Sequence, residues 1–251
     1  MGNKYNFLEV GCADCTVIKL NSKIVMVDCH QGGDGEENIM DWIPNNHIDV
    51  LIITHQHYDH FDGIQTLIDN AVSVTELWEC PYERRHGDNS VGYSEWQDYQ
   101  KLKQKLVKNG TKVYKPTRGT KVYDTVGGTN IQILNPPKNI NSYATRELHD
   151  ACLVFRVGTN LFTGDASDYA LQQILDYYDL KTKHILHASH HGSINGANNE
   201  FIKKVNPNYT VISTKSGVHS NVPHSTALQR YRTHTKKNVY RTDTNGTITF
   251  S

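Results

Sequence analysis

Residues 50–60 read Val50-Leu51-Ile52-Ile53-Thr54-His55-Gln56-His57-Tyr58-Asp59-His60, and this stretch decides the fold. Its first four residues form a short, wholly apolar run, which is typical of a strand covered on both faces. Three imidazoles and one carboxylate follow within six residues, where that strand would end. Borderline divalent metals prefer these ligands, so the stretch predicts a metal-binding loop in which His55 and His57 face one ion and Asp59 and His60 a second.

Strand-like and helix-like segments alternate on both sides of this loop. Apolar runs bounded by turn residues predict strands at 7–10, 16–20, 24–27, 112–114, 131–134, 152–157, 161–163, 184–187 and 209–213. Helical spacing predicts helices at 38–43, 64–68, 93–109, 169–178 and 201–205. The 251 residues show no repeat or linker, so we expect one domain over 1–251 with an α/β architecture, an αββα sandwich.

Charge and hydropathy restrict the partners of the chain. Lys and Arg together number 26, as do Asp and Glu, so the net field does not draw the protein onto nucleic acid or an anionic membrane. No apolar run approaches the roughly 18 residues that would span a bilayer. Met1 to Tyr5 leads into a strand-like segment and does not resemble a signal peptide. We therefore expect a cytoplasmic protein with no membrane partner.

Cysteine and histidine usage point to different roles. Five cysteines, an odd number, favour a reducing compartment over a disulfide framework. Cys12 and Cys15 form a lone C-x-x-C, for which two buried neutral thiols are favoured over zinc or redox chemistry. The 14 histidines exceed what packing needs, and several are clustered. The chemistry is expected where they cluster.

Two further motifs follow the histidine loop in the chain. They are Phe162-Thr163-Gly164-Asp165, at a strand end, and Ser189-His190-His191-Gly192-Ser193. With H-x-H-x-D-H they resemble the metallo-β-lactamase superfamily over almost the whole chain, which implies a four-layer αββα sandwich. The resemblance implies that Asp165 bridges two ions, that His191 is a ligand, and that His190 faces substrate or braces the ligands.

A finer resemblance points to one branch, the nuclease-like domain of competence DNA-uptake proteins. It rests on Phe7 to Asp14 as the opening strand and Gly-Asp turn, Val25 to Asp28, Pro223-His224, and the closing turn Thr242 to Gly246. Two positions depart from that branch. Ala13 replaces the usual glycine, and His149-Asp150-Ala151-Cys152 stands where the branch has an asparagine-to-serine segment.

The second departure matters because the wider superfamily has a metal-ligating histidine just before the strand predicted at 152–157. His149 would then complete the first metal site, although a surface histidine or one that supports a ligand is the alternative. The resemblance implies two divalent ions, zinc first, with manganese or iron as alternatives. The implied metal ligands are His55, His57, His149 and Asp165 for the first ion, and Asp59, His60, Asp165 and His191 for the second.

Three residues are candidates for roles in the reaction. Asp59 could orient a water activated by the ions, and His190 or His224 could assist departure of an alkoxide. Asp28 could accept a proton from a ligating imidazole or could be an ordinary turn aspartate. Polar residues of a late loop could line the rim of the same site, although a surface loop is favoured for them and a solvated turn for a small basic group. The apolar stripe from Trp96 to Leu106 is expected to be packing. Those polar candidates are Lys215, Ser213, His219 and Asn221 in a late loop, and Arg84, Arg85 and His86 in a turn.

The substrate prediction is a phosphodiester: DNA, RNA or a nucleotide. The resemblance to the competence branch favours it, while the neutral charge and the lack of a long basic run stand against a nuclease. Hydrolysis of a lactone or small carboxylic ester is the alternative, because one superfamily site serves several reactions. A non-catalytic metal-binding or interaction module is the third hypothesis.

Overall fold

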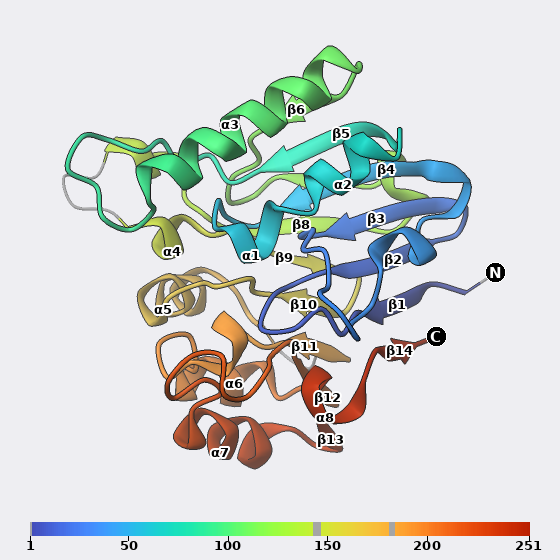
Figure 1. Cartoon of the computed structure of the whole chain (residues 1–251). Coiled ribbons are helices and arrows are strands. Elements are labelled where there is room, and N and C mark those ends of the chain that lie inside the picture. The colour runs from blue at the N-terminus through green and yellow to red at the C-terminus, as the bar shows by residue number, and fades with distance from the viewer. Residues whose placement is uncertain (1, 143–146, 181–183) are drawn as a thin grey trace.

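Two seven-stranded sheets pack face to face in the computed structural model, which describes residues 2–142, 147–180 and 184–251 (Figure 1). The first sheet has the order β14-β1-β2-β3-β4-β5-β6 and the second β13-β12-β11-β10-β9-β8-β7. The strands of the first sheet are β1 (Lys4–Phe7), β2 (Thr16–Leu20), β3 (Lys23–Val27), β4 (His47–Ile53), β5 (Ser73–Glu79), β6 (Lys112–Tyr114) and β14 (Ile248–Phe250). Those of the second are β7 (Lys121–Val122), β8 (Ile131–Asn135), β9 (Val154–Val157), β10 (Asn160–Phe162), β11 (Ile185–His187), β12 (Tyr209–Ile212) and β13 (Asn238–Arg241).

Helices cover the outer face of each sheet, which confirms the predicted αββα sandwich. On the first sheet lie α1 (Tyr58–Phe61), α2 (Ile64–Asp69) and α3 (Tyr93–Lys108) (Figure 1). The later helices are α4 (Leu148–Ala151), α5 (Asp168–Tyr177), α6 (Asn199–Val205), α7 (Ser225–His234) and α8 (Thr242–Asn245). One apolar cluster fills the space between the sheets, and two more lie under the outer helices. Burying apolar surface on both faces of both sheets is what holds the four layers together.

Strand β4 is buried on both faces, as its apolar run predicts. Val50 and Ile52 lie in the cluster between the sheets, whereas Leu51 and Ile53 lie in the cluster under α2 and α3. The strand pairs in parallel with β3 and β5. The predicted packing of the stripe on α3 is also confirmed, because Tyr99, Leu102 and Leu106 are buried.

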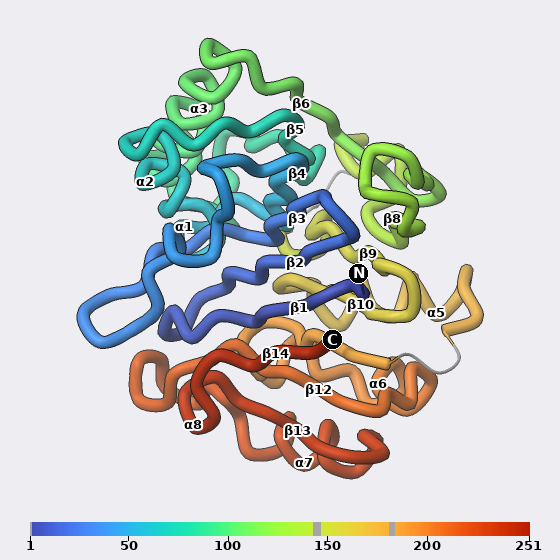
Figure 2. The backbone as a smooth tube through the Cα atoms, turned by 90° about the vertical axis from the view of Figure 1, so that its right-hand side faces the viewer, coloured from blue at the N-terminus to red at the C-terminus, as the bar shows by residue number. Residues whose placement is uncertain are grey.

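Several elements differ from the sequence prediction. The first strand ends at Phe7 and does not extend to Val10, because Leu8 N donates to Cys15 O and the chain turns at Gly11, whose φ is +86°. The predicted helix at 38–43 is a single 3₁₀ turn, Ile39–Trp42, followed by a second turn that begins at Pro44. Strands β5, β13 and β14 and helix α7 were not predicted from sequence. Pairing partners decide these strands: β14 is held by β1 from the opposite end of the chain (Figure 2).

The two sheets present the ends of their parallel strands on one side of the molecule. Strands β3 and β4 in the first sheet and β10, β11 and β12 in the second run in parallel with a neighbour. Open parallel sheets bind ligands at the carboxyl ends of their strands. The histidine loop follows β4, the segment with Asp165 follows β10, and the pair His190-His191 follows β11.

All five cysteines are buried free thiols. Burial raises the pKa of the Cys15 thiol above its usual value. Cys12 and Cys15 are thus buried free thiols, as predicted. Within residues 2–142, 147–180 and 184–251, no helix combines the length and apolarity that crossing a bilayer would need.

Candidate metal centre

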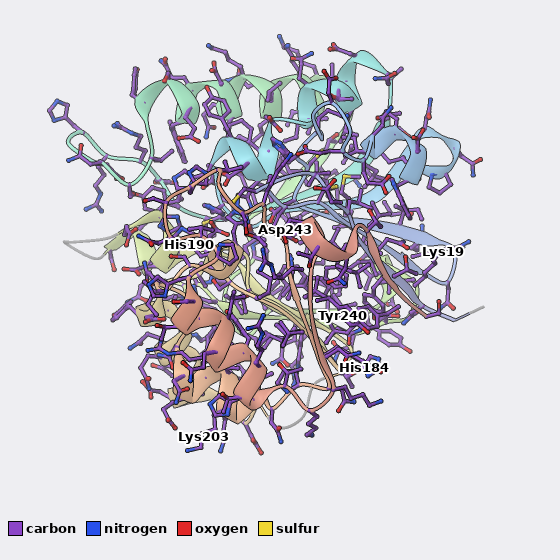
Figure 3. The ribbon with its side chains drawn as sticks, turned by 60° about the horizontal axis from the view of Figure 1, so that its bottom comes forward. Lys19, His184, His190, Lys203, Tyr240 and Asp243 are labelled. Atoms are coloured by element: carbon purple, nitrogen blue, oxygen red, sulfur yellow. The ribbon has the colours of Figure 1, made fainter. Side chains whose placement is uncertain are left out.

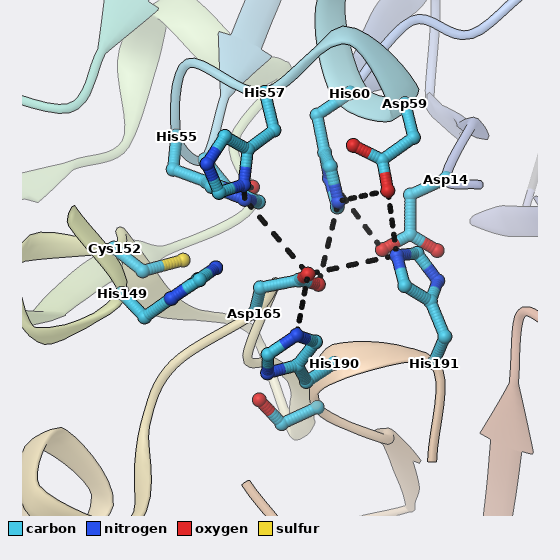
Figure 4. Close-up of polar contacts among 12 residues, drawn as sticks. Asp14, His55, His57, Asp59, His60, His149, Cys152, Asp165, His190 and His191 are labelled. Carbon is cyan, nitrogen blue, oxygen red and sulfur yellow. Dashed lines mark hydrogen bonds and ion pairs between the residues drawn. The ribbon is translucent and has the colours of Figure 1, made fainter. Parts of the chain in front are cut away.

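Three overlapping groups of potential metal ligands meet at the shared edge of the sheets (Figure 4). The first contains His55, His57 and His149, and the second contains Asp14, His60, Asp165 and His191. The third contains His149, Asp165 and His190, so it shares a member with each of the other two. Within each group the ligand atoms all lie within 4.8 Å of one another. The residues come from segments far apart in sequence, so the folded chain, and not local spacing alone, gathers them.

In the first group, the hydrogen-bond network fixes which imidazole nitrogen carries the proton. His57 Nε2 lies 2.8 Å from the carbonyl of Ser90, and His149 Nδ1 lies 2.7 Å from a carboxylate oxygen of Glu147. Both partners only accept, so each of these ring nitrogens must donate. The other nitrogen of each ring, His57 Nδ1 and His149 Nε2, then carries a free lone pair.

His55 completes the first group in the same way. Thr54 Oγ1 donates to Asp28 and lies 3.2 Å from His55 Nδ1, which therefore donates to it. The free lone pair of His55 Nε2 then lies 3.0 Å from His57 Nδ1. Two lone pairs at that separation repel each other unless a cation lies beside both. The donor set therefore fits a divalent metal.

The second group repeats this arrangement. His60 Nδ1 lies 2.9 Å from Asp28 Oδ2, and His191 Nδ1 lies 3.0 Å from the carbonyl of Ser213. Among the described residues, the Nε2 atoms of both histidines are buried without a hydrogen-bond partner. Metal-ligating histidines usually donate their second nitrogen to a carboxylate or carbonyl in this manner. Asp28, which the sequence left between two roles, thus lies behind His60 and orients it.

Asp165 belongs to the second and third groups and also lies close to the first. Its Oδ1 is 3.3 Å from His60 Nε2, and its Oδ2 is 3.5 Å from His191 Nε2 and 3.8 Å from His55 Nε2 (Figure 4). A carboxylate in this position can offer one oxygen to each group. The placement agrees with the bridging role that the resemblance implies for Asp165.

The carboxylates and imidazoles of the centre shift one another's pKa values. Burial alone would raise the pKa of Asp165, but His191, His60 and His190 hold it well below its usual value. Burial alone would lower the pKa of His60, but Asp165, Asp59 and Asp28 raise it well above its usual value. Burial and then repulsion from His60 lower the pKa of His55. Burial alone would likewise lower the pKa of His191, but Asp165 and a hydrogen bond with Asp59 raise it above its usual value. Because a metal binds the neutral imidazole, metal binding should release any proton that these rings hold.

Backbone strain is concentrated in the same place. Asp28, His190 and His191 all have φ values between 51° and 53°, in the left-handed region that non-glycine residues rarely adopt. Gly164 has a φ of +45°, and a Cβ at this position would lie 2.7 Å from Thr54. The sheets approach too closely here for a larger residue. The fold holds these conformations so that the side chains beside them point inward.

Asp59 and His190 lie at the more open side of the centre. Asp59 Oδ2 is 3.2 Å from His191 Nε2, and a third of its side-chain surface is exposed. His190 Nε2 is 3.8 Å from Asp165 Oδ2, and its ring stacks on that of His149 with centroids 4.7 Å apart. Both residues therefore face the space that a substrate would enter.

His224 lies outside the ligand groups found among the described residues. Its Nδ1 accepts a hydrogen bond from Thr226 N at 3.1 Å, so the side chain caps helix α7. Its backbone N–H donates to Gly192 O, which attaches the Pro223-His224 turn to the loop that carries His191. The sequence did not predict this capping role.

Other candidates have structural partners. Ser213 was expected at the surface, but it is buried, and its hydroxyl lies 2.8 Å from His187 Nε2. Lys215 forms an ion pair with Glu36. Arg84 donates to backbone carbonyls of its own turn and stacks on Tyr93. His219 and Asn221 are exposed, as predicted.

Not every histidine belongs to the centre. The ring of His184 makes a T-shaped contact with the ring of Tyr209, and Figure 3 shows His184 well apart from His190. Conversely, sequence reasoning missed three residues that touch the ligands: Asp14, Ser90 and Glu147. The Gly-Asp turn containing Asp14 was noticed only as a motif, and the contact of the Ser90 carbonyl had no signal in the sequence.

Replacement of Asp28 tests the arrangement behind His60. In Asp28→Asn the amide can donate to His60 Nδ1, which moves the imidazole proton to Nε2 and removes the free lone pair. We expect the affinity for metal to fall about 10- to 100-fold, measured by competition with a chromogenic chelator. Asp49→Asn is the matched control, because Asp49 is a buried carboxylate that binds Lys23 and Ile24 N away from the centre. Equal affinities in both variants would contradict the role of Asp28.

Comparison with known proteins agrees with this geometry. A sequence model described as "Metallo-beta-lactamase superfamily" matches residues 10–134, which include the histidine loop. The chain belongs to the metallo-beta-lactamase superfamily. Among curated proteins, ComE operon protein 3 of Bacillus subtilis (strain 168) is 31% identical over 90 residues, 36% of this chain. This match agrees with the predicted branch but covers only 12% of that protein's length.

Several solved structures share the fold at low sequence identity. A mutant of CmlA beta-hydroxylase matches with a TM-score of 0.63 and 14% identity, over all of this chain and 54% of that one. YhfI from Bacillus subtilis, titled a metallo-beta-lactamase fold protein, matches over the full length of both chains with a TM-score of 0.60 and 13% identity. A diphosphatase of the PhnP family matches with a TM-score of 0.57 and 10% identity, over 99% of this chain and 98% of that one. These likenesses show that the chain has the metallo-beta-lactamase fold.

Proposed function

We propose that the chain is a hydrolase that uses two divalent metal ions to cleave a phosphodiester. The observation that carries the proposal is the gathering of five imidazoles in two neighbouring ligand groups, with each ring fixed by a hydrogen bond on its far side. His55, His57 and His149 would hold one ion, and His60, His191 and Asp59 the other. Zinc is the first candidate, and manganese or iron are alternatives.

Bound divalent ions in such a centre lower the pKa of water toward neutrality and neutralise charge on phosphoryl oxygens. The protein's own groups must then orient the reactants. Asp59, partly exposed beside His191, is placed to hold a water molecule and accept its proton. His190, whose Nδ1 has no partner among the described residues, is placed to contact an oxygen of the substrate. His224 caps α7, so we do not assign it a step.

Two relatives support a phosphorus substrate. The local similarity to ComE operon protein 3 favours the competence branch, and one structural neighbour is titled a diphosphatase. Another neighbour is titled a beta-hydroxylase, so the fold by itself does not fix the reaction. DNA, RNA and nucleotides all contain the proposed bond, and the neutral charge of the chain favours the smaller substrates.

A substrate panel tests the proposal. We expect the protein, with its purified metal and with added manganese, to hydrolyse a generic aryl phosphodiester faster than a lactone or a thioester. The Asp165→Ala variant is the negative control. Turnover of the lactone alone would replace the proposal with an esterase. No turnover of any substrate by a fully metal-loaded protein would favour a non-catalytic module.

Salt dependence then separates a nuclease from an enzyme for small phosphodiesters. Even two phosphate contacts predict about a tenfold loss of affinity when salt rises from about 50 to about 200 mM. We expect the KM for a dinucleotide to change less than the KM for a long single strand. A long strand whose KM is lower and rises steeply with salt would identify a nuclease.

A further inference from the structure

The second ligand group contains a carboxylate that does not come from the histidine loop. Asp14 lies in the turn between β1 and β2, and only 2% of its surface is exposed. Its backbone N–H donates to Asp59 O at 3.0 Å, and its carbonyl accepts from His30 N at 3.2 Å. The turn is therefore tied by backbone hydrogen bonds to the loop that carries Asp59 and His60.

Each member of this group has a buried polar atom that makes no hydrogen bond of good geometry among the described residues, although Asp165 Oδ1 lies 3.3 Å from His60 Nε2 and Asp14 Oδ1 lies 3.3 Å from His187 Nε2. The four atoms are Asp14 Oδ1, His60 Nε2, Asp165 Oδ1 and His191 Nε2. A single unsatisfied buried polar atom is costly, and native proteins contain few of them. Four such residues from four separate segments, with ligand atoms within 4.8 Å, indicate a common partner with positive charge.

We infer that Asp14 is a direct ligand of the cation held by His60, Asp165 and His191. Asp14 approaches from the buried side, with 3% of its side-chain surface exposed, against 33% for Asp59. With Asp14 completing the buried set, Asp59 is not required as a permanent ligand and can interact with water or substrate. The inference rests on the proposed metal binding but is independent of the identity of the substrate.

The ligand set has a consequence for the choice of metal. With Asp14 included, two imidazoles and as many as three carboxylates surround this position. Oxygen-rich sets suit manganese, whereas the three imidazoles of the first group suit zinc. We expect the second position to accept manganese more readily than the first.

A rival role for Asp14 is an ion pair with His187. Asp14 Oδ1 lies 3.3 Å from His187 Nε2, which is also 2.8 Å from Ser213 Oγ. The His187 ring packs 5.1 Å from the ring of Phe7. In His187→Phe the aromatic packing is retained and the ion pair is removed, so this variant isolates the rival role.

The experiment measures metal content and affinity in the full chain, with no substrate present. The variants are Asp14→Asn, Asp14→Ala, His187→Phe and the matched control Asp49→Asn. Elemental analysis gives the number of ions bound, chelator competition gives their affinities, and the visible spectrum of the cobalt(II)-loaded protein reports the coordination. Circular dichroism verifies that each variant is folded, and the Asn variant is isosteric should the Ala variant fail to fold.

We expect both Asp14 variants to bind one of the two ions more than about 100-fold more weakly, beyond the 10- to 100-fold expected for a residue that only supports a ligand. His187→Phe and Asp49→Asn should retain two ions. Folded Asp14 variants that keep two ions with unchanged affinity and cobalt spectrum would overturn the inference. A protein that loses the ion in Asp14→Asn but cleaves no phosphodiester in its wild-type form would instead overturn the proposed function alone.

Discussion

Asp165→Asn is expected to lower the rate of phosphodiester hydrolysis by about 10³-fold or more. The residue contributes oxygens to both ligand groups, at 3.3 Å from His60 and 3.8 Å from His55. Metal ions supply several kcal/mol of stabilisation to a hydrolytic transition state, and each 1.36 kcal/mol is a factor of ten in rate. Removing the shared negative charge should weaken both ions together. Steady-state kinetics and elemental analysis of the purified variant measure the two effects.

The control for this variant is Asp168→Asn, three residues further along the chain. Asp168 accepts a hydrogen bond from Gly196 N at 3.0 Å and lies at the start of α5, outside the ligand groups found among the described residues. It should retain both ions and normal turnover. A folded Asp165→Asn variant with two ions and full activity would show that the two groups are not joined through this carboxylate.

Removal of metal is expected to abolish activity and to lower the melting temperature. An ion present at about 100 times its dissociation constant stabilises the fold by about 2.7 kcal/mol. At about 2–4 °C per kcal/mol for a chain of this size, each ion should contribute about 5–10 °C. Without cations, the lone pairs of His55 and His57 face each other, and Asp165, Asp59 and Asp14 lie close together. Differential scanning fluorimetry before and after chelation measures the change.

Adding back zinc, manganese or iron singly then identifies the metal. The cation that restores both the melting temperature and the turnover is the functional one. Recovery of the melting temperature without turnover would indicate a structural ion. An unchanged melting temperature and rate after complete chelation would contradict the metal centre as a whole.

Local patterns in the sequence predicted many of the helices and strands. The run from Val50 to Ile53 predicted a doubly buried strand because four consecutive apolar residues need cover on both faces, and the clusters on its two sides provide it. The sequence also predicted the buried stripe on α3 and the strands that end before Asp165 and His190. Strand β14, of three residues, was missed because pairing, and not local composition, decides whether so short a segment becomes a strand.

The sequence likewise predicted part of the candidate site, and the tertiary structure decided the rest. Its residue types and their order along the chain are set by the sequence: H-x-H-x-D-H, the strand-end Asp165 and the His190-His191 pair. His149 was drawn from a resemblance, and the structure places it with His55 and His57. His224 was a candidate for assisting departure of an alkoxide, whereas its ring accepts a hydrogen bond at the N-terminus of α7.

By itself, the sequence determined that this chain forms an αββα sandwich and carries imidazoles and carboxylates at its strand ends. Hydrophobic patterning and ligand chemistry are local properties, so they are readable from neighbouring residues. Only the tertiary structure decided which nitrogen of each histidine is free, and that Asp14 joins His60, Asp165 and His191. Those facts depend on contacts such as those of Ser90, Asp28 and Ser213, and packing of distant segments fixes such contacts.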